Sequence, residues 1–261
     1  MSRLQILYSK ELARQLGKVA VYLPGAPIDV GDIITFPKGK SFLGKAKPLG
    51  SFMKVSSLKK LGVSYPKPKF SNTPDTYKFS SDNAVGFNFD INANADLGES
   101  DLPSGNSSAT INFSSEGAIY FLGIDCDKKQ LEDIVSLQNE IVDKGKDLLW
   151  KDTFLVTSIT IAKKAFIAQS QSKTSQLLIE GNVRGLNTNI ASLKANSKLN
   201  IKKQKGDIFI KEWSNDVTVF MDLIRFEKET FSENFRGEKV STKTKYRILF
   251  KPVQIEELLS D

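Results

Sequence analysis

The chain has 261 residues, of which 40% are hydrophobic and 26% are charged, and its formal net charge is +7. These fractions are typical of a globular protein with one large domain or two small ones. The sequence has no histidine and one cysteine, Cys126. This excludes catalysis by an imidazole base, an internal disulfide, and metal centres built from imidazole or thiolate groups. We therefore expect no enzyme, no bound metal and no cofactor.

The positive charge is concentrated in the first part of the chain. Residues 1–70 hold thirteen Lys or Arg and three acidic residues, a net charge of +10, which leaves −3 for residues 71–261. A basic lobe of this kind attracts nucleic acid or an anionic lipid surface, unless it is only a solvated surface. We find no apolar run long enough for a membrane-spanning helix and no signal-peptide pattern. With a lone cysteine, this favours a cytoplasmic protein.

Short elements are predicted before residue 84. Ser9 is a candidate N-cap for a helix over residues 10–16, and Gly17 is its expected stop. Alternating apolar residues predict strands at 19–23 and 28–36. Residues 37–76 are rich in Gly, Pro, Ser and Lys, so we expect irregular chain with short elements there.

The most regular pattern is a strict alternation of apolar with polar or small side chains. It predicts a long β-hairpin from residues 84–97 and 108–113, joined by a polar connection. Residues 85–97 exceed the usual strand length of about 5–6 residues and reach the roughly 9–11 that a membrane-crossing strand needs. The apolar row consists of Val85, Phe87, Phe89, Ile91, Ala93, Ala95, Leu97, Ala109, Ile111 and Phe113.

The second half of the chain predicts a helix over 127–145 and strands at 153–161, 165–168, 207–212 and 217–226. Residues 176–179 and 191–201 predict a second hairpin, whose apolar row includes Ala191, Leu193, Ala195, Leu199 and Ile201. Residues 229–245 are polar and predict an accessible linker.

The predicted fold class is α+β, with a central twisted, mostly antiparallel sheet, long hairpins, flanking helices and a short C-terminal tail. We expect one domain over residues 1–249 and a separate tail over residues 250–261. The tail is acidic and carries a small apolar set, namely Val253, Ile255, Leu258 and Leu259.

These patterns leave two classes of function open. A pore-forming protein would turn the apolar rows of both hairpins toward lipid and the polar rows toward a wet lumen. A soluble β-rich binding module for nucleic acid or protein would bury the apolar rows in a core and use the basic N-terminal lobe. The length of the hairpins and the basic lobe favour the pore former.

The order of these parts resembles the bacterial gasdermins. The resemblance covers most of residues 9–228 and rests on layout and scattered residues. It includes a helix at 11–16, a strand ending in proline at 19–24, an Ile-x-x-Gly-Asp-Ile segment at 28–33, a Leu-Gly element with a basic stretch at 48–52, the helical insert at 127–144, a Val-Thr-x-x-x-x-x-Lys pattern at 156–163 and a closing strand at 220–226.

The resemblance implies a mechanism. The resting chain would be a cytoplasmic monomer whose tail, residues 250–261, covers the oligomerising surface. A partner protease would cut the linker near Arg236 and Lys239. The released chains would then oligomerise in the inner membrane, with both hairpins spanning it, and would kill the cell in defence against phage.

The same resemblance implies contact with anionic lipids and no binding of nucleic acid. The expected headgroup contacts are Arg14, Lys18, Lys45, Lys47, Lys59 and Lys60. Many members of the family carry an acylated cysteine close to the N-terminus. Residues 1–20 of this chain contain none, and we do not expect acylation of Cys126.

Overall fold

The computed structural model describes residues 2–39, 46–90, 108–144, 152–181, 183, 186, 199–231 and 245–260. These residues form a mixed α+β fold with antiparallel strand pairing throughout both of its sheets, as the sequence predicts. The helices are α1 (Ser2–Leu16), α2 (Ile134–Lys144) and α3 (Ile255–Leu259). The strands are β1 (Val19–Ala20), β2 (Asp32–Thr35), β3 (Met53–Ser57), β4 (Lys69–Phe70), β5 (Asp75–Ser80), β6 (Val85–Asp90), β7 (Ser108–Phe113), β8 (Ile119–Gln130), β9 (Phe154–Ser170), β10 (Ser175–Gly181), β11 (Leu199–Lys205), β12 (Ile208–Phe231) and β13 (Lys245–Pro252).

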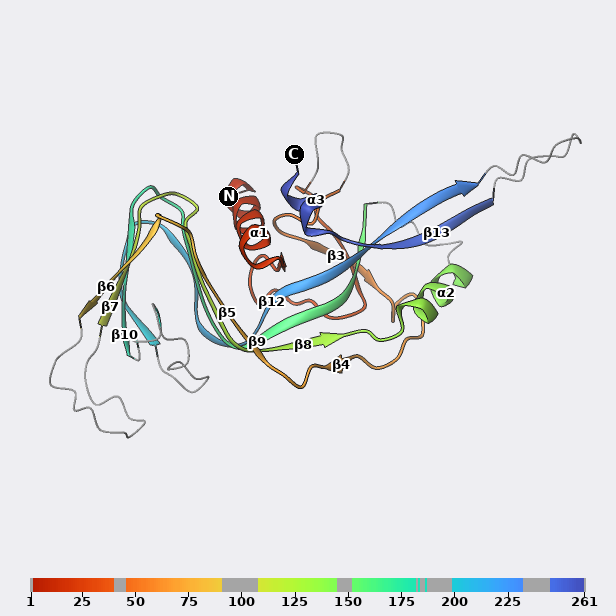
Figure 1. The fold of residues 1–261 in the computed structure, drawn as a ribbon, viewed down its shortest axis with the longest axis horizontal. Helices are drawn as coiled ribbons and strands as arrows, with labels where there is room; N and C mark the ends of the chain where they lie inside the picture. The colour runs from red at the N-terminus through yellow and green to blue at the C-terminus, as the bar shows by residue number, and fades with distance from the viewer. Residues whose placement is uncertain are drawn as a thin grey trace, which may run out of the picture.

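The larger sheet is built on two long strands, β9 and β12, which pair from Phe154↔Arg225 to Ser170↔Ile208. On its other side β9 pairs with β8 and, near its start, with β2, which continues to β3. The free side of β12 takes β1 and then β13. Figure 1 shows the β12–β13 hairpin extending away from the body at the end opposite the smaller sheet.

The smaller sheet has the strand order β11-β10-β7-β6. The first hairpin supplies β6 and β7, and the second supplies β10 and β11. The hairpins are joined by the pairing of β7 with β10, from Phe113↔Ser175 to Ser108↔Glu180. Sequence analysis predicts each hairpin but does not predict that the two form one sheet.

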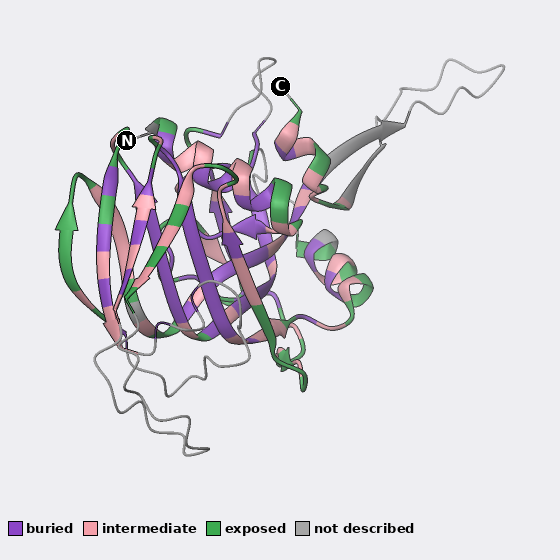
Figure 2. Cartoon of the chain, turned by 60° about the vertical axis from the view of Figure 1, so that its left-hand side comes forward, coloured by how far each residue is buried: buried purple, intermediate pink, exposed green. Residues whose placement is uncertain are grey.

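Three apolar clusters hold the fold together, and Figure 2 shows that most buried residues lie along the long strands. One cluster lies beneath α1, whose residues Leu4, Tyr8 and Leu12 recur every four positions and are buried. A second lies between the smaller sheet and the strands β8 and β9. The third fills the end of the larger sheet where α3 docks.

The helix α1 begins earlier than predicted. The apolar row already starts at Leu4, so Ser9 lies inside the helix rather than at its cap. Its hydroxyl donates to the Gln5 carbonyl at 3.1 Å and accepts from the Gly50 amide at 2.9 Å. The predicted stop is correct, because Gly17 has φ +62° and donates to the Ala13 carbonyl at 3.0 Å.

The helix predicted from residue 127 is wrong at its start. Residues 127–130 continue strand β8, because they pair with residues 158–161 of β9 and the ladder outweighs the local helical pattern. The helix α2 starts at Ile134, after Asp133, whose carboxylate accepts from the Ser136 amide at 3.0 Å as an N-cap does.

Several predicted strand limits also change. The strands predicted at 153–161 and 165–168 form one continuous strand, β9, and those predicted at 207–212 and 217–226 form one continuous strand, β12. Register shifts in the pairing of β9 with β12 take the place of the predicted breaks. The strands predicted at 19–23 and 28–36 shorten to β1 and β2. Both ends of the predicted linker are strand as well, since β12 runs to Phe231 and β13 begins at Lys245.

Candidate functional site: a two-faced sheet and a docked tail

The smaller sheet has one apolar and one polar face. Alternate residues of β7 and β10 are buried, and the corresponding residues of β6 are half-buried while their neighbours are exposed. The apolar face packs on Tyr120 of β8, whose ring centroid lies 5.3 Å from that of Phe87. In this structure the predicted apolar rows therefore face protein. The buried members of these rows are Ala109, Ile111, Phe113 and Leu199. Leu177 and Ile179 of β10, which the prediction does not name, are buried with them, and Val85, Phe87, Phe89 and Ile201 pack against this group.

The remaining predicted hairpin residues lie outside the described part of the chain. These are Ile91, Ala93, Ala95, Leu97, Ala191, Leu193 and Ala195.

Both margins of the smaller sheet are open in the described residues. Strand β6 pairs there with β7 alone, and β11 pairs with β10 alone. Each margin therefore presents backbone N–H and C=O groups to which a further strand can hydrogen-bond. A sheet with open margins can be extended by edge-to-edge pairing with another strand.

The strand of the tail lies toward the other end of the molecule, and its helix α3 lies beside α1 (Figure 1). Its strand β13 pairs with β12 from Pro252↔Ile224 to Lys245↔Phe231, so the docked segment begins before the predicted boundary at residue 250. The helix α3 follows and places Leu258, with no exposed surface, in the third apolar cluster. The other predicted tail residues, Val253, Ile255 and Leu259, pack half-buried against the same cluster.

Arg225 of β12 makes polar contacts between the tail and the body, and sequence analysis did not identify it. Its side chain is 11% exposed and forms an ion pair with Glu257 of α3 at 2.9 Å. It also donates to the Ala46 carbonyl at 3.1 Å, and its guanidinium lies 5.4 Å from the centroid of the Phe154 ring. Arg225 thus ties the tail to the segment that precedes Lys47.

Lys47 is placed differently from the other predicted headgroup contacts. It is 8% exposed, and its ammonium donates to the Ser260 carbonyl and, at 3.3 Å, to the Ser260 hydroxyl. While the tail is docked, Lys47 is therefore not available to a lipid headgroup.

Four of the other predicted headgroup contacts can be located. Arg14 is exposed near the end of α1 and pairs with Glu11 at 2.7 Å. Lys18 is half-buried, 5.9 Å from the centroid of the Tyr77 ring. Lys59 and Lys60 are exposed in the turn that follows β3, whereas Lys45 lies outside the described residues.

The predicted cleavage residues Arg236 and Lys239 also lie outside the described residues. Their flanking strands β12 and β13 form the hairpin that points away from the body in Figure 1. The segment that joins them, residues 232–244, therefore starts and ends at the far end of that hairpin.

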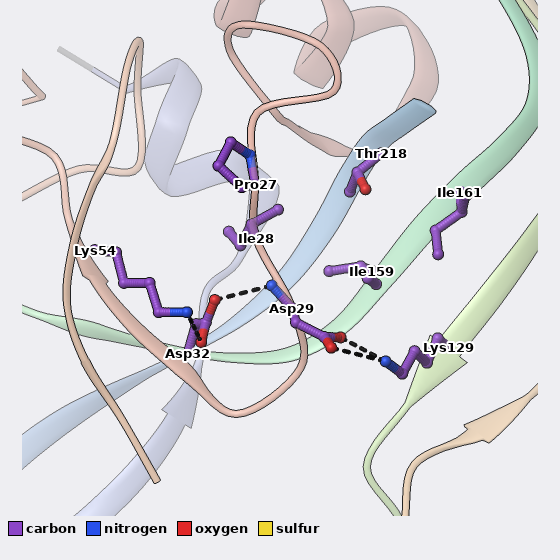
Figure 3. Close-up of a pocket in the computed structure, with 9 residues that line it drawn as sticks. All are labelled: Pro27, Ile28, Asp29, Asp32, Lys54, Lys129, Ile159, Ile161 and Thr218. Atoms are coloured by element: carbon purple, nitrogen blue, oxygen red, sulfur yellow. Dashed lines mark hydrogen bonds and ion pairs between the residues drawn. The ribbon is translucent and has the colours of Figure 1, made fainter. Parts of the chain in front are cut away.

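A hollow of about 360 Å³ between β2, β3, β8, β9 and β12 is a further candidate site, which sequence analysis did not single out (Figure 3). Its carboxylates are already paired, Asp32 with Lys54 at 2.6 Å and Asp29 with Lys129 at 2.7 Å. Asp32 also accepts from the Asp29 amide at 2.9 Å. These contacts fix the loop before β2, and we assign the hollow a structural role.

Two further observations concern chemistry. Cys126 is buried. Burial, and to a smaller extent the negative charge of Asp75, raises the pKa of its thiol to about 12, which makes the thiol a poor nucleophile. Within the described part of the chain, no group of three or more Asp, Glu or Cys side chains could hold a metal ion.

Comparisons with known proteins give few matches. No protein-family model and no curated protein matches the chain. No helix in the described ranges has the length and apolar character needed to cross a membrane. Solved structures that are similar to the chain include the following two. The gasdermin A3 membrane pore is 11% identical, with 90% of this chain and 96% of that chain covered and a TM-score of 0.31. A bacterial gasdermin from Bradyrhizobium tropiciagri is 16% identical, with 85% and 86% covered and a TM-score of 0.33. At these TM-scores neither likeness establishes a family.

Proposed function

We propose that this chain is a gasdermin-like pore-forming protein that is held at rest by its tail. The observation that carries the proposal is the smaller sheet, in which two hairpins form one two-faced wall with open margins. Copies of such a wall can pair through β6 of one chain and β11 of the next. A ring closed in this way leaves no unpaired backbone group, which is the condition for strands to stand in lipid.

The lengths of the hairpins support the same proposal. The alternation that begins in β6 continues in the sequence to Leu97, thirteen residues in all. A strand of that length can span the hydrocarbon core, for which roughly 9–11 tilted residues suffice. In this proposal the apolar face, which packs on Tyr120 at rest, turns to lipid, and the polar face turns to water.

The tail is the proposed inhibitor, and its docked segment runs from Lys245 to Ser260. Its strand occupies the margin of β12, and its helix places Leu258 in a core cluster. Burying one leucine side chain contributes about 1.5–3 kcal/mol. A contribution of this size favours the docked state, and in this proposal a cut in the chain before β13 lets the tail dissociate.

The trigger in this proposal is a protease that cuts residues 232–244. The activated chains then bind anionic lipids of the inner membrane, oligomerise and kill the cell in defence against phage. These finer steps come from the resemblance in layout to bacterial gasdermins. The described strands on either side, β12 and β13, project from the body in Figure 1, and this supports the proposal of a cut between them.

Dye release from anionic liposomes tests this function. The chain would carry an engineered protease site within residues 232–244, and the same protein without protease is the control. We expect release after the cut alone. If neither form releases dye while the cut protein keeps its circular dichroism spectrum, the proposal fails. Salt-sensitive binding of DNA or RNA by the intact chain would instead favour the soluble binding module.

A pair of neighbouring substitutions tests which face meets lipid. Phe89→Asp places a charge on the apolar face, and Asn88→Asp places the same charge on the exposed face of the same strand. We expect Phe89→Asp to abolish dye release from cut protein and Asn88→Asp to retain it. Equal release from both variants, with both proteins folded, would argue against a lipid-facing apolar row.

A further inference from the structure

The exposed face of the smaller sheet contains a hollow. It has a volume of about 280 Å³ and is lined by Thr110, Gln176, Leu178, Lys203 and Lys205. These residues come from three adjacent strands, β7, β10 and β11. Both hairpins therefore contribute to its wall.

The strand register explains why these side chains meet. Leu178 of β10 pairs with Thr110 of β7 on one side and with Lys203 of β11 on the other. Two positions away along β10, on the same face, Gln176 pairs with Lys205. The register shift between Leu178 and Ile179 keeps both lysines on the polar face while Ile201 packs on the apolar one.

The hollow carries positive charge without a matching carboxylate. Lys203 and Lys205 both line it, no acidic residue lines it, and neither lysine forms an ion pair within the described ranges. The acidic side chain farther along β10, Glu180, is engaged by Lys202 at 3.2 Å. Two like charges on one face of a strand repel each other, and an anion bound between them would lower this repulsion.

We propose that this hollow binds a small phosphate-bearing anion. The two ammonium groups supply the charge, and the Thr110 hydroxyl and the Gln176 amide supply neutral donors. A phosphate group carries three or more acceptor oxygens and up to two negative charges, so it can accept bonds from several strands at once. A carboxylate or a chloride ion can satisfy fewer of these donors.

Binding has a structural consequence, because the ligand would touch β7 of the first hairpin and both strands of the second. A bound anion therefore strengthens the joint between the hairpins. This inference does not depend on pore formation, since it concerns the exposed face of the sheet as it stands in the resting chain.

The test is a titration of the intact chain with inorganic phosphate and with pyrophosphate, at constant ionic strength kept with chloride. The readout is the backbone amide shifts of residues 175–181 and 199–205 in nuclear magnetic resonance spectra. We expect saturable shifts, with tighter binding of pyrophosphate than of phosphate. Lys203→Gln combined with Lys205→Gln should weaken binding at least tenfold.

The matched control combines Lys38→Gln with Lys67→Gln, which removes the same charge from two exposed positions outside the smaller sheet. Binding in this control should equal that of the unchanged chain. The proposal is overturned if the amide shifts do not saturate, or if both double variants weaken binding equally. Either result would mean that the anion responds to the net charge of the chain and not to this hollow.

A second arm separates two sources of phosphate, using sedimentation of the intact chain with phosphatidylglycerol vesicles. Sedimentation that needs Lys203 and Lys205 and is reversed by pyrophosphate would identify a lipid headgroup as the ligand, which supports the site. Saturable phosphate binding without such sedimentation would identify a free anion, which also supports it. Sedimentation without any phosphate response at residues 199–205 would overturn it. Dye release is scored separately, so a failed pore and a failed anion site give different results.

Discussion

The two ends of the molecule are held in different ways. The smaller sheet is held by continuous ladders and by a broad apolar face with six fully or nearly fully buried side chains. The docked tail is held by the buried Leu258, by one ladder along a single margin, by the polar contacts of Arg225 and Lys47, and by the half-buried side chains of Val253, Ile255 and Leu259. The sheet is thus held by a wider buried apolar face than the tail, and the proposed release of the tail requires that this smaller dock opens while the sheet stays folded.

The largest effect should come from the apolar face of the sheet. Ile111 of β7 has no exposed surface, and Ile111→Ala should lower the free energy of unfolding by about 2–5 kcal/mol. Urea titration followed by circular dichroism measures this change. Asn88→Ala, on the exposed face of β6, is the control and should change the free energy by less than about 0.5 kcal/mol. Equal effects would show that the face is not the main support of this end.

A smaller and local effect should follow from loosening the tail. Arg225→Ala removes a mostly buried guanidinium that bonds to both Glu257 and the Ala46 carbonyl, and should weaken docking by about 2–3 kcal/mol. Hydrogen exchange should become faster in residues 245–260 and stay unchanged in β7 and β10. Faster exchange in both regions would mean that the two ends are one cooperative unit, which contradicts the comparison.

Replacing Glu257, the ion-pair partner of Arg225, should weaken docking less than replacing Arg225. Glu257 is 38% exposed, so water screens its ion pair, and Glu257→Gln should weaken docking by about 0.5 kcal/mol. The same exchange experiment compares it with Arg225→Ala. An effect as large as that of Arg225→Ala would show that the ion pair, rather than the contacts with Ala46 and Phe154, holds the tail.

The two ends also differ in how far the sequence predicts them. The alternation at residues 85–90 and 108–113 is local, so the sequence predicts the strands and their apolar face. The pairing of β7 with β10 is not local, and no residue pattern specifies it. The contacts of Arg225 with Ala46 and of Lys47 with Ser260 span 179 and 213 positions. A basic side chain far from its partner in sequence has the same local pattern as any surface charge, so the sequence alone specifies neither of these two contacts.

The smallest expected effect concerns Asp222, which lies on β12 just before the residues that pair with the tail. Burial disfavours its charged form, but hydrogen bonds from Lys128 at 2.7 Å and Ser158 at 2.6 Å outweigh burial and lower the pKa of its carboxyl. A carboxyl whose pKa is lower in the folded than in the unfolded state stabilises the fold fully above the unfolded value of about 3.9. That contribution is lost as pH falls through the folded pKa.

Asp222→Asn should therefore reduce the pH dependence of unfolding below about pH 4 and leave the tail docked at neutral pH. Urea titrations at a series of pH values measure the slope, and Ser158→Ala should show an intermediate slope because Lys128 still bonds to the carboxylate. An unchanged slope in Asp222→Asn would assign the acid sensitivity to other carboxyls. Faster hydrogen exchange in residues 245–260 of this variant at neutral pH would show that β12 couples the tail to the body, because Asp222 contacts neither β13 nor α3 through any bond described above.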